Sequence, residues 1–203
     1  MAELARAIDD EALKPRLLDR DELMSRVRVH NGLSAVHSQN SARIQPAKLV
    51  RGLAAAAERR GVIIYEGTAA ETISRNFVQT AGGGVRAEII VRATEGYTSQ
   101  LPGHDKKLIP LNSAIIVTEP LPESVWRELG WEGLETLSET SYAYSYCQRT
   151  REGRITVGGR GVPYRFGSAT DVNGQTQDQT ISMLKADLRR LFPQVADAHI
   201  DLL

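Results

Sequence analysis

Tyrosine and arginine residues in one stretch of this sequence form the pattern best suited to binding a small polar molecule. The run YAYSYCQ alternates, so Tyr142, Tyr144 and Tyr146 share one face of a predicted strand. A tyrosine side chain offers an apolar wall together with a hydroxyl group. Arg149 and Arg160 each end or follow a strand, and a planar guanidinium group binds carboxylates well. We therefore predict that Tyr144 and Tyr146 line a substrate pocket, and that Arg149 or Arg160 holds an anionic substrate group.

The same alternation leaves a second interpretation open. In it, the tyrosine face packs against a helix predicted at 177–192, and both arginines are solvated. The other face of the strand carries Ala143, Ser145 and Cys147. Such a face favours a buried, unreactive thiol over a nucleophile at Cys147.

Other kinds of chemistry find little support in the sequence. The four histidines lack the tight spacing to other ligands that a metal site needs, so no metal site is predicted. Gly82, Gly84 and Ala87 fit a permissive GxGxxA motif, but a strand follows where a dinucleotide fingerprint needs a helix. We interpret those glycines as a hairpin turn. The sequence contains neither a P-loop nor a GxSxG elbow.

Composition narrows the class of protein. The 203 residues carry 25 basic and 25 acidic side chains, so nothing indicates nucleic acid or an anionic membrane as a partner. No apolar stretch approaches the roughly 20 residues that span a bilayer, and the N-terminus does not resemble a secretory signal. Cys147 is the only cysteine, which excludes an internal disulfide. We expect a soluble cytoplasmic protein.

The first part of the chain is predicted to contain three helices and one buried strand, with loop or weak strand at 29–45. Residues 2–13 carry a loose apolar stripe typical of a short helix, and Asp19 begins a capping-box pattern. Between Pro46 and Gly61, apolar residues recur at helical spacing, with proline and glycine in the positions that start and end helices. The apolar run at 62–66 (VIIYE) then predicts a buried strand in a helix-covered layer.

Strands dominate the rest of the sequence. Segments 77–80 and 85–91 flank a glycine-rich link and predict a hairpin. Further strands are predicted at 112–118, 142–148 and 154–158, the last two joined as a second hairpin. Thr176 and Gln179 suggest a capping box at the start of the last helix, which Pro193 ends.

These elements indicate a mixed α/β fold with two parts. Residues 43–103 form an αβ layer that an inserted β-hairpin interrupts. Residues 104–203 form an antiparallel sheet, which also receives residues 1–42.

Several segments of the sequence, in order across about 120 residues, resemble a known family. Residues 41–73 are similar to the flavin-dependent oxidoreductases of the glycine oxidase, sarcosine oxidase and D-amino-acid oxidase family. The matching residues are Pro46, Leu49, Val50, Leu53, Ala54, Ala57, Gly61, Val62, Ile64, Tyr65, Glu66, Thr68 and Ile73. An A-T-x-x-Y-T segment follows at Ala93, Thr94, Tyr97 and Thr98. The later runs LIPLNSAIIVTEPLP and GRITVGGRG resemble the substrate domain of the γ-glutamylputrescine oxidase-like branch.

The resemblance implies an FAD-binding role for residues 43–103 and a substrate-domain role for 1–42 and 104–203. It places the backbone around Ala69 and Ala70 near the adenine end of FAD. The loop at Ala93, Thr94 and Glu95 would pass near the pyrophosphate and ribose, where small residues let the backbone come close to the cofactor. The intact enzyme would move a hydride from the amine-bearing carbon of a small amine or amino acid to FAD.

Two parts of the family pattern are missing from this sequence. It contains neither the strand–GxGxxG–helix segment that grips the FAD pyrophosphate nor the glycine-rich segment over the flavin ring. We therefore expect an internal fragment that binds FAD weakly or not at all and self-associates through uncovered apolar surface. The alternative is a non-catalytic binding or interaction module that derives from such an enzyme.

Overall fold

The chain divides into two compact units. The computed structural model describes residues 15–109, 111–140, 144–160 and 176–201, so the helix predicted at 2–13 and the position of Tyr142 lie outside the described residues. The sheet unit comprises the described residues up to Arg43 and from Asn112 onward, and the hairpin unit those from Ile44 to Leu111. The predicted roles of 43–103 as the FAD-binding part and of 1–42 and 104–203 as the substrate domain stay predictions. Contacts within a unit do not show what that unit binds.

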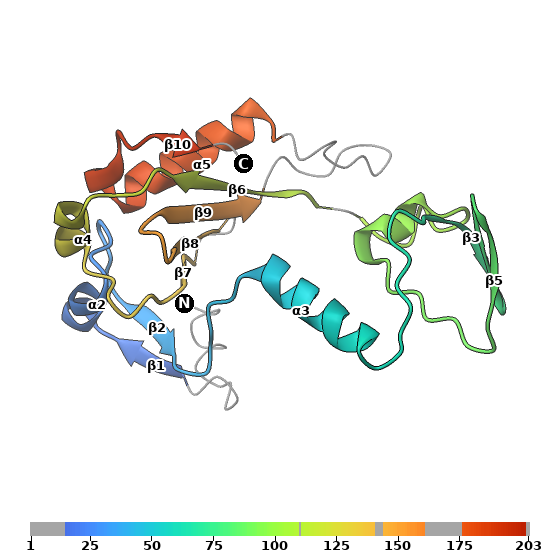
Figure 1. Ribbon diagram of the computed structural model, residues 1–203. Coiled ribbons are helices and arrows are strands. Elements are labelled where there is room, and N and C mark those ends of the chain that lie inside the picture. Colours follow the sequence, from blue (N-terminus) through green and yellow to red (C-terminus); the bar gives the residue numbers. More distant parts are fainter. Residues whose placement is uncertain (1–14, 110, 141–143, 161–175, 202–203) are drawn as a thin grey trace. The chain divides into compact units, whose positions relative to one another are not determined.

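An antiparallel five-stranded sheet is the centre of the sheet unit (Figure 1). Its strands are β6 (Ser113–Thr118), β7 (Leu137–Ser138), β8 (Ser145–Arg149), β9 (Ile155–Arg160) and β10 (Ile200–Asp201). They run in the order β10, β6, β9, β8, β7. The predicted hairpin of β8 and β9 is confirmed, with Cys147 opposite Val157. This sheet, together with the helices, confirms the mixed fold class.

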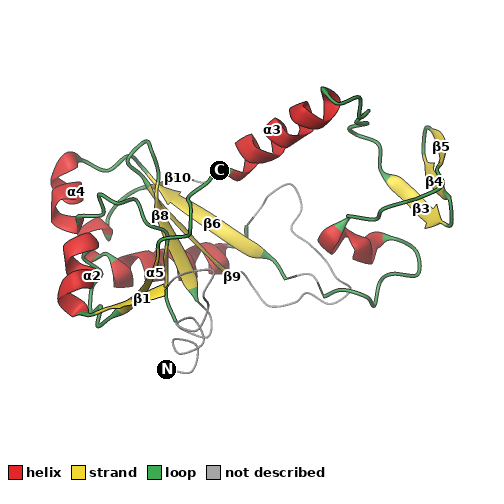
Figure 2. Ribbon diagram, turned by 90° about the horizontal axis from the view of Figure 1, so that it is seen from below, coloured by secondary structure: helices red, strands yellow, loops and turns green. Residues whose placement is uncertain are grey.

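Helix α5 (Asp178–Leu191) covers one face of this sheet (Figure 2). Leu184 and Leu188 of α5 are buried with Val157 in the core. Trp131 stacks on Phe192 with 5.3 Å between ring centroids, at the end of the core that α4 (Glu123–Leu129) and η3 (Pro193–Val195) close. The predicted helix is confirmed, but its predicted capping box is wrong. Gln177 is the N-cap and makes no capping hydrogen bond through its side chain.

The N-terminal segment packs beside the sheet but does not extend it. Helix α2 (Arg20–Arg26) begins at the predicted capping box, in which the Asp19 carboxylate accepts a hydrogen bond from the backbone N–H of Glu22 at 2.9 Å. Strands β1 (Pro15–Leu18) and β2 (Ala35–Ser38) pair with each other in a separate two-stranded sheet. Among the described residues, neither strand pairs with a strand of the five-stranded sheet, so the expectation that this segment joins the larger sheet is wrong.

The hairpin unit contains one helix and a three-stranded antiparallel sheet. Its elements are α3 (Pro46–Glu58), β3 (Ala70–Ser74), β4 (Phe77–Thr80), β5 (Gly83–Arg86) and the 3-10 helix η1 (Glu95–Gln100). The predicted helix and the predicted hairpin of β4 and β5 are confirmed, although the second hairpin strand ends at Arg86. No residue of α3 is buried.

The strand predicted at 62–66 is wrong. These residues form no strand, and Ile63 and Tyr65 are 73% and 71% exposed. A strand needs a neighbour for its N–H and C=O groups, and no described segment of the hairpin unit pairs with this one. Among the described residues, no helix is long and apolar enough to cross a membrane.

Candidate functional site

The tyrosine strand presents two chemically different faces. In β8, Ser145 and Cys147 are buried and Tyr146 is 36% exposed, and Tyr144, which directly precedes the strand, is 44% exposed. The buried face lies toward α5, since a Cβ on Gly159, the register partner of Ser145, would come within 3.1 Å of a methyl carbon of Leu184. The interpretation in which the tyrosines pack on the last helix therefore does not hold. Tyr144 and Tyr146 share the open face of the sheet.

A glycine on the neighbouring strand lets Tyr146 lie flat against this open face. Gly158 of β9 is the register partner of Tyr146. A Cβ on Gly158 would lie 2.3 Å from ring carbons of Tyr146, so the phenol ring covers the glycine. Ile115 of β6 is the next residue in the same row and is 52% exposed. Gly158 and Ile115 were not predicted as site residues, although the alternation along β9 could have identified Gly158.

The phenol of Tyr146 stays protonated at neutral pH. Partial burial, and to a lesser degree the charge on Tyr144, raise the pKa of Tyr146 above its usual value of 10.0. The hydroxyl group can therefore donate a hydrogen bond to a molecule on the open face.

An ionic cluster holds the start of β8. The Glu139 carboxylate accepts hydrogen bonds from the Ser145 hydroxyl at 2.8 Å and from Arg190 of α5 at 2.7 Å. Arg190 also contacts Asp187 at 3.0 Å. Burial acts to raise the pKa of Glu139, but the hydrogen bonds from Ser145 and Arg190 outweigh it, and the net pKa is lowered. The cluster fixes the start of the strand that carries Tyr146 and follows Tyr144, and no local pattern in the sequence indicated it.

Arg149 has structural partners on the other side of the sheet. Its guanidinium carbon lies 4.1 Å from the centroid of the Trp126 ring, and Nη1 donates to the carbonyl oxygen of Trp131 at 3.3 Å. Glu132 lies 3.7 Å from the same nitrogen. Arg149 thus alternates with the tyrosines along β8 and does not share their face.

Arg160 occupies a different position relative to the tyrosines. It is the last residue of β9 and pairs through its backbone with Ser113 of β6. Because residues two apart lie on the same side of a strand, its position corresponds to that of Gly158.

Cys147 belongs to the core rather than to the site. It is 1% exposed, and burial raises the pKa of its thiol to about 12. The predicted unreactive thiol agrees with this burial.

The residues expected near the cofactor all lie in the hairpin unit. Ala69 and Ala93 are exposed, and Ala70 and Thr94 are half-buried. Thr94 shares a 2.7 Å hydrogen bond with Thr98, which holds the first turn of η1. The Glu95 carboxylate accepts a hydrogen bond from the backbone N–H of Gly96. Among the described residues, no hydrogen bond joins the alanines at 69–70 to the loop at 93–95.

These residues are compatible with part of a dinucleotide cofactor. The exposed methyl groups of Ala69 and Ala93 leave the backbone open to a ligand. Arg92, which precedes this loop, adds a positive charge beside the position expected for the pyrophosphate. The predicted residues of this unit concern only the adenine, ribose and pyrophosphate of the cofactor. None of them is predicted to contact the flavin ring.

Comparison with known proteins gives consistent matches. The family model described as FAD dependent oxidoreductase matches residues 1–201. A probable oxidoreductase OrdL from Rhizobium meliloti is 27% identical over 191 residues, covering 90% of this chain and 41% of the relative. A protein of the same name from Haemophilus influenzae is 24% identical, covering 92% of this chain and 42% of its own length.

Solved structures share the fold. L-proline dehydrogenase from P. horikoshii superposes with a TM-score of 0.74 and 17% identity, covering 94% of this chain and 51% of its own. Glycine oxidase from Bacillus cereus also gives a TM-score of 0.74, with 16% identity, covering 99% of this chain and 54% of its own. The chain thus spans less than half of the curated relatives and about half of these structures.

Proposed function

Because this chain belongs to the FAD dependent oxidoreductase family, we propose that the whole protein oxidises an amine or amino acid by passing a hydride to FAD. The names of two similar structures, L-proline dehydrogenase and glycine oxidase, support an amino-acid type of substrate. The chain spans 41–42% of its curated relatives, so the proposal concerns the activity of the whole protein. The cytoplasmic location expected from the sequence is part of the same proposal.

The open face of the five-stranded sheet carries this proposal. Tyr144, Tyr146 and Ile115 expose apolar surface there, and Gly158 lets the Tyr146 ring lie flat. Such a surface is suited to one wall of a site for a small amine, with the tyrosine hydroxyl groups orienting polar groups of the substrate. The flavin, when bound, supplies the hydride acceptor.

Arg149 and Arg160 differ in how well they could bind an anionic group of the substrate. Arg160 is the better candidate for an anionic substrate group, because its strand position matches that of Gly158. Arg149 remains the alternative, but its guanidinium group would have to leave Trp126 and the carbonyl oxygen of Trp131. We therefore assign Arg149 a positioning role that holds the end of β8.

Turnover in the whole flavin-loaded protein tests these assignments. Tyr144, Tyr146, Arg149 and Arg160 are replaced singly by Phe or Gln, and kcat/KM is measured with a panel of amines and amino acids. Loss of a paired arginine–carboxylate contact should lower kcat/KM about 100-fold. If all four variants stay within about threefold while folded and flavin-loaded, the site assignment is wrong. If no amine or amino acid reduces the bound flavin, the alternative of a non-catalytic module is supported instead.

The 203-residue chain by itself should bind FAD weakly or not at all. The glycine loop and helix N-terminus that carry much of pyrophosphate binding in dinucleotide sites are absent from its sequence. Flavin fluorescence titration of the purified chain measures this directly. Purification of a yellow protein with one FAD per chain would contradict the prediction.

A further inference from the structure

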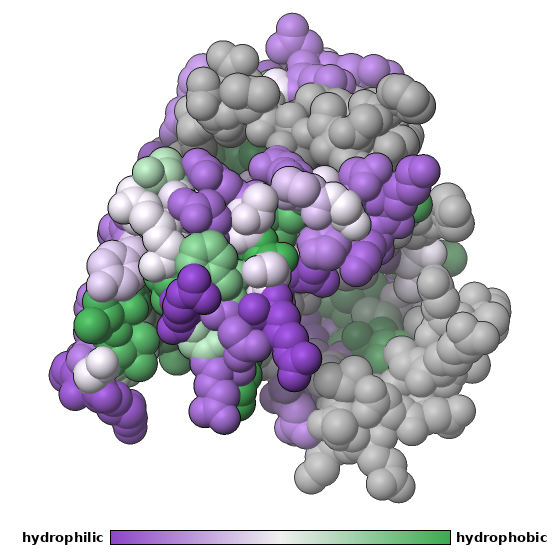
Figure 3. All heavy atoms as spheres, turned by 90° about the vertical axis from the view of Figure 1, so that its right-hand side faces the viewer, coloured by the Kyte–Doolittle hydropathy of each residue, from purple (hydrophilic) through white to green (hydrophobic). Residues whose placement is uncertain are grey.

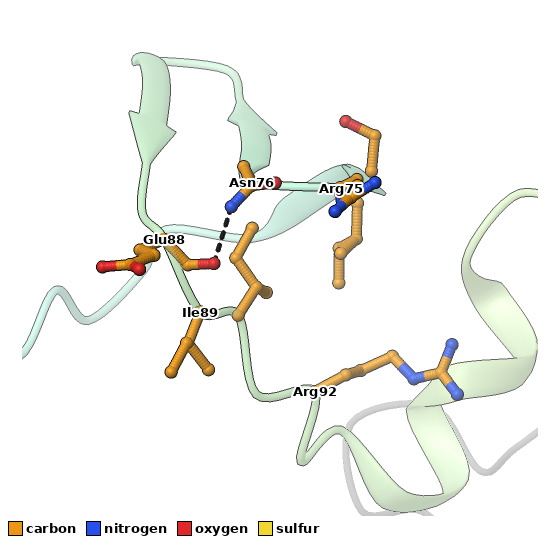
Figure 4. A pocket seen from close by; sticks show the side chains of 8 residues that line it. Arg75, Asn76, Glu88, Ile89 and Arg92 are labelled. Carbon is orange, nitrogen blue, oxygen red and sulfur yellow. Dashed lines mark hydrogen bonds between the residues drawn. The ribbon is translucent and has the colours of Figure 1, made fainter.

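A hollow of about 530 Å³ lies in the hairpin unit, but its polar groups do not converge on a ligand (Figure 4). The side-chain amide of Asn76 is already used, because it donates to the carbonyl oxygens of Ala87 at 3.0 Å and of Glu88 at 2.6 Å. The charged groups of Arg75, Glu88 and Arg92 point in different directions (Figure 4). The open face of the five-stranded sheet brings complementary groups closer together.

Ile115 is a large apolar side chain that this sheet holds at the surface. It is 52% exposed, whereas its neighbours Ala114 and Ile116 in β6 are 7% and 2% exposed and belong to the core. Strand β6 pairs with β9 along its length, with Ile115 opposite Gly158. The side chain of Ile115 therefore cannot turn into the core unless both of its buried neighbours leave it.

The hydroxyl group of Tyr146 lies in the same row of the sheet as Ile115. Gly158 of β9 is the register partner of both residues, with β8 on one side and β6 on the other. A Cβ added to Gly158 would lie 2.5 Å from the Tyr146 hydroxyl oxygen, so the hydroxyl end of the ring lies over this glycine. Because neighbouring strands are only about 4.8 Å apart, a hydrogen-bonding group and an exposed alkyl group are adjacent on one rigid sheet.

We propose that Ile115 is a specificity-determining residue that limits the size of an alkyl group on the substrate, while the Tyr146 hydroxyl binds a polar group of the same molecule. A substrate held at the hydroxyl would bring its apolar substituent against Ile115, about one strand spacing away. A branched alkyl wall favours a short substituent by contact and excludes a bulky one by steric overlap. The inference rests on the proposed oxidation of an amine or amino acid, because the same open face would receive that substrate.

Turnover of the whole flavin-loaded protein measures this selection. In Ile115→Ala and Ile115→Phe, kcat/KM is compared between amines or amino acids that differ only in the length or branching of one alkyl group. Ile115→Ala should raise the ratio of kcat/KM for bulky over small substrates about tenfold, and Ile115→Phe should lower it by a similar factor. Leu17→Ala is the matched control and should leave the ratio unchanged, because Leu17 is 53% exposed but lies in the separate two-stranded sheet.

Binding without turnover separates this inference from the proposed function. Alkyl carboxylates of increasing chain length carry no amine, yet their carboxylate can accept a hydrogen bond from the Tyr146 hydroxyl. Calorimetry on the whole protein should show a preference for short chains, which Ile115→Ala shifts toward longer ones.

The combined results distinguish two failures. If no amine or amino acid reduces the flavin but the chain-length preference still shifts, amine oxidation is wrong and the selecting role of Ile115 stands. The inference itself is overturned if both Ile115 variants, folded and flavin-loaded, leave the turnover ratio and the chain-length preference within about twofold. It is also overturned if Leu17→Ala changes either quantity as much as they do.

Discussion

Gly158 determines where the Tyr146 ring can lie, and replacing it should move the ring. In Gly158→Ala, the added Cβ would meet ring carbons at 2.3 Å, so the flexible tyrosine must swing away from the sheet. The ring then becomes more exposed, and the raised pKa of Tyr146 should fall toward its usual value of 10.0. Ultraviolet titration of the tyrosines measures this change.

A matched control separates this effect from a general effect of alanine. Gly82 has no atom within 4 Å of an added Cβ and lies in the hairpin unit. Gly82→Ala should therefore leave the tyrosine titration unchanged. An unchanged titration in Gly158→Ala as well would show that the ring does not rest on this glycine.

The thiol of Cys147 should react slowly in the native protein. It is buried, and its pKa is raised to about 12, so almost no thiolate exists at neutral pH. Because the sequence has one cysteine, labelling with a thiol reagent reports this site alone. We expect slow labelling in buffer and fast labelling in denaturant. Rapid native labelling would contradict the burial of this face of β8.

At the scale of elements, the ionic cluster in which Glu139 contacts Ser145 of β8 and Arg190 of α5 should make the stability of the fold depend on pH. The pKa of Glu139 is lowered from 4.5 in the folded state, so its contribution is present above that pH and is lost as pH falls through the folded value. Glu139→Gln retains an acceptor for Ser145 but loses the charge that pairs with Arg190. At neutral pH, the free energy of unfolding of the variant should be about 1 kcal/mol lower than that of the natural chain. When the pH is lowered, the free energy of unfolding should fall less in the variant than in the natural chain.

Denaturant unfolding at neutral and acidic pH measures both effects. Glu152→Gln is the control, because Glu152 is an exposed turn residue between β8 and β9 without a recorded partner among the described residues. If the free energy of unfolding falls equally on acidification in Glu139→Gln and in the natural chain, the ionic cluster does not contribute to stability.

Elements with local signals could be predicted from the sequence. The capping box at Asp19, the proline that begins α3 and the glycine-rich link before β5 each act within a few residues. The segment 62–66 could not be predicted in this way, since an apolar run becomes a strand only beside a partner, and this unit provides none among its described residues. Local sequence carries no information about that partner.

The candidate site shows the same limit. Alternation correctly separated Tyr144 and Tyr146 from Ser145 and Cys147, because side chains along a strand point to opposite sides. It could not decide which side meets α5, since that depends on contacts with a distant segment. The role of Glu139 depends likewise on Arg190, 51 positions away in the sequence.

At the scale of the whole molecule, the chain exposes several large apolar side chains on and near α3. In α3, Leu49, Val50 and Leu53 are 48%, 64% and 61% exposed, and nearby Ile63 is 73% exposed. Figure 3 shows hydrophobic side chains, in green, reaching the surface between hydrophilic ones. Exposed apolar patches favour association. The formal net charge of zero provides no long-range repulsion to oppose it.

We therefore predict that the chain self-associates in a concentration-dependent way. Sedimentation velocity over a wide concentration range should show the average mass rising above 22.3 kDa. Leu53→Lys and Ile63→Lys place charges on the exposed apolar residues and should shift association to higher concentration. Gln100→Lys adds the same charge at an already polar, exposed position of η1 and should have little effect. A single monomeric species of the natural chain at high concentration would contradict the prediction, because the exposed residues would then be tolerated without a covering partner.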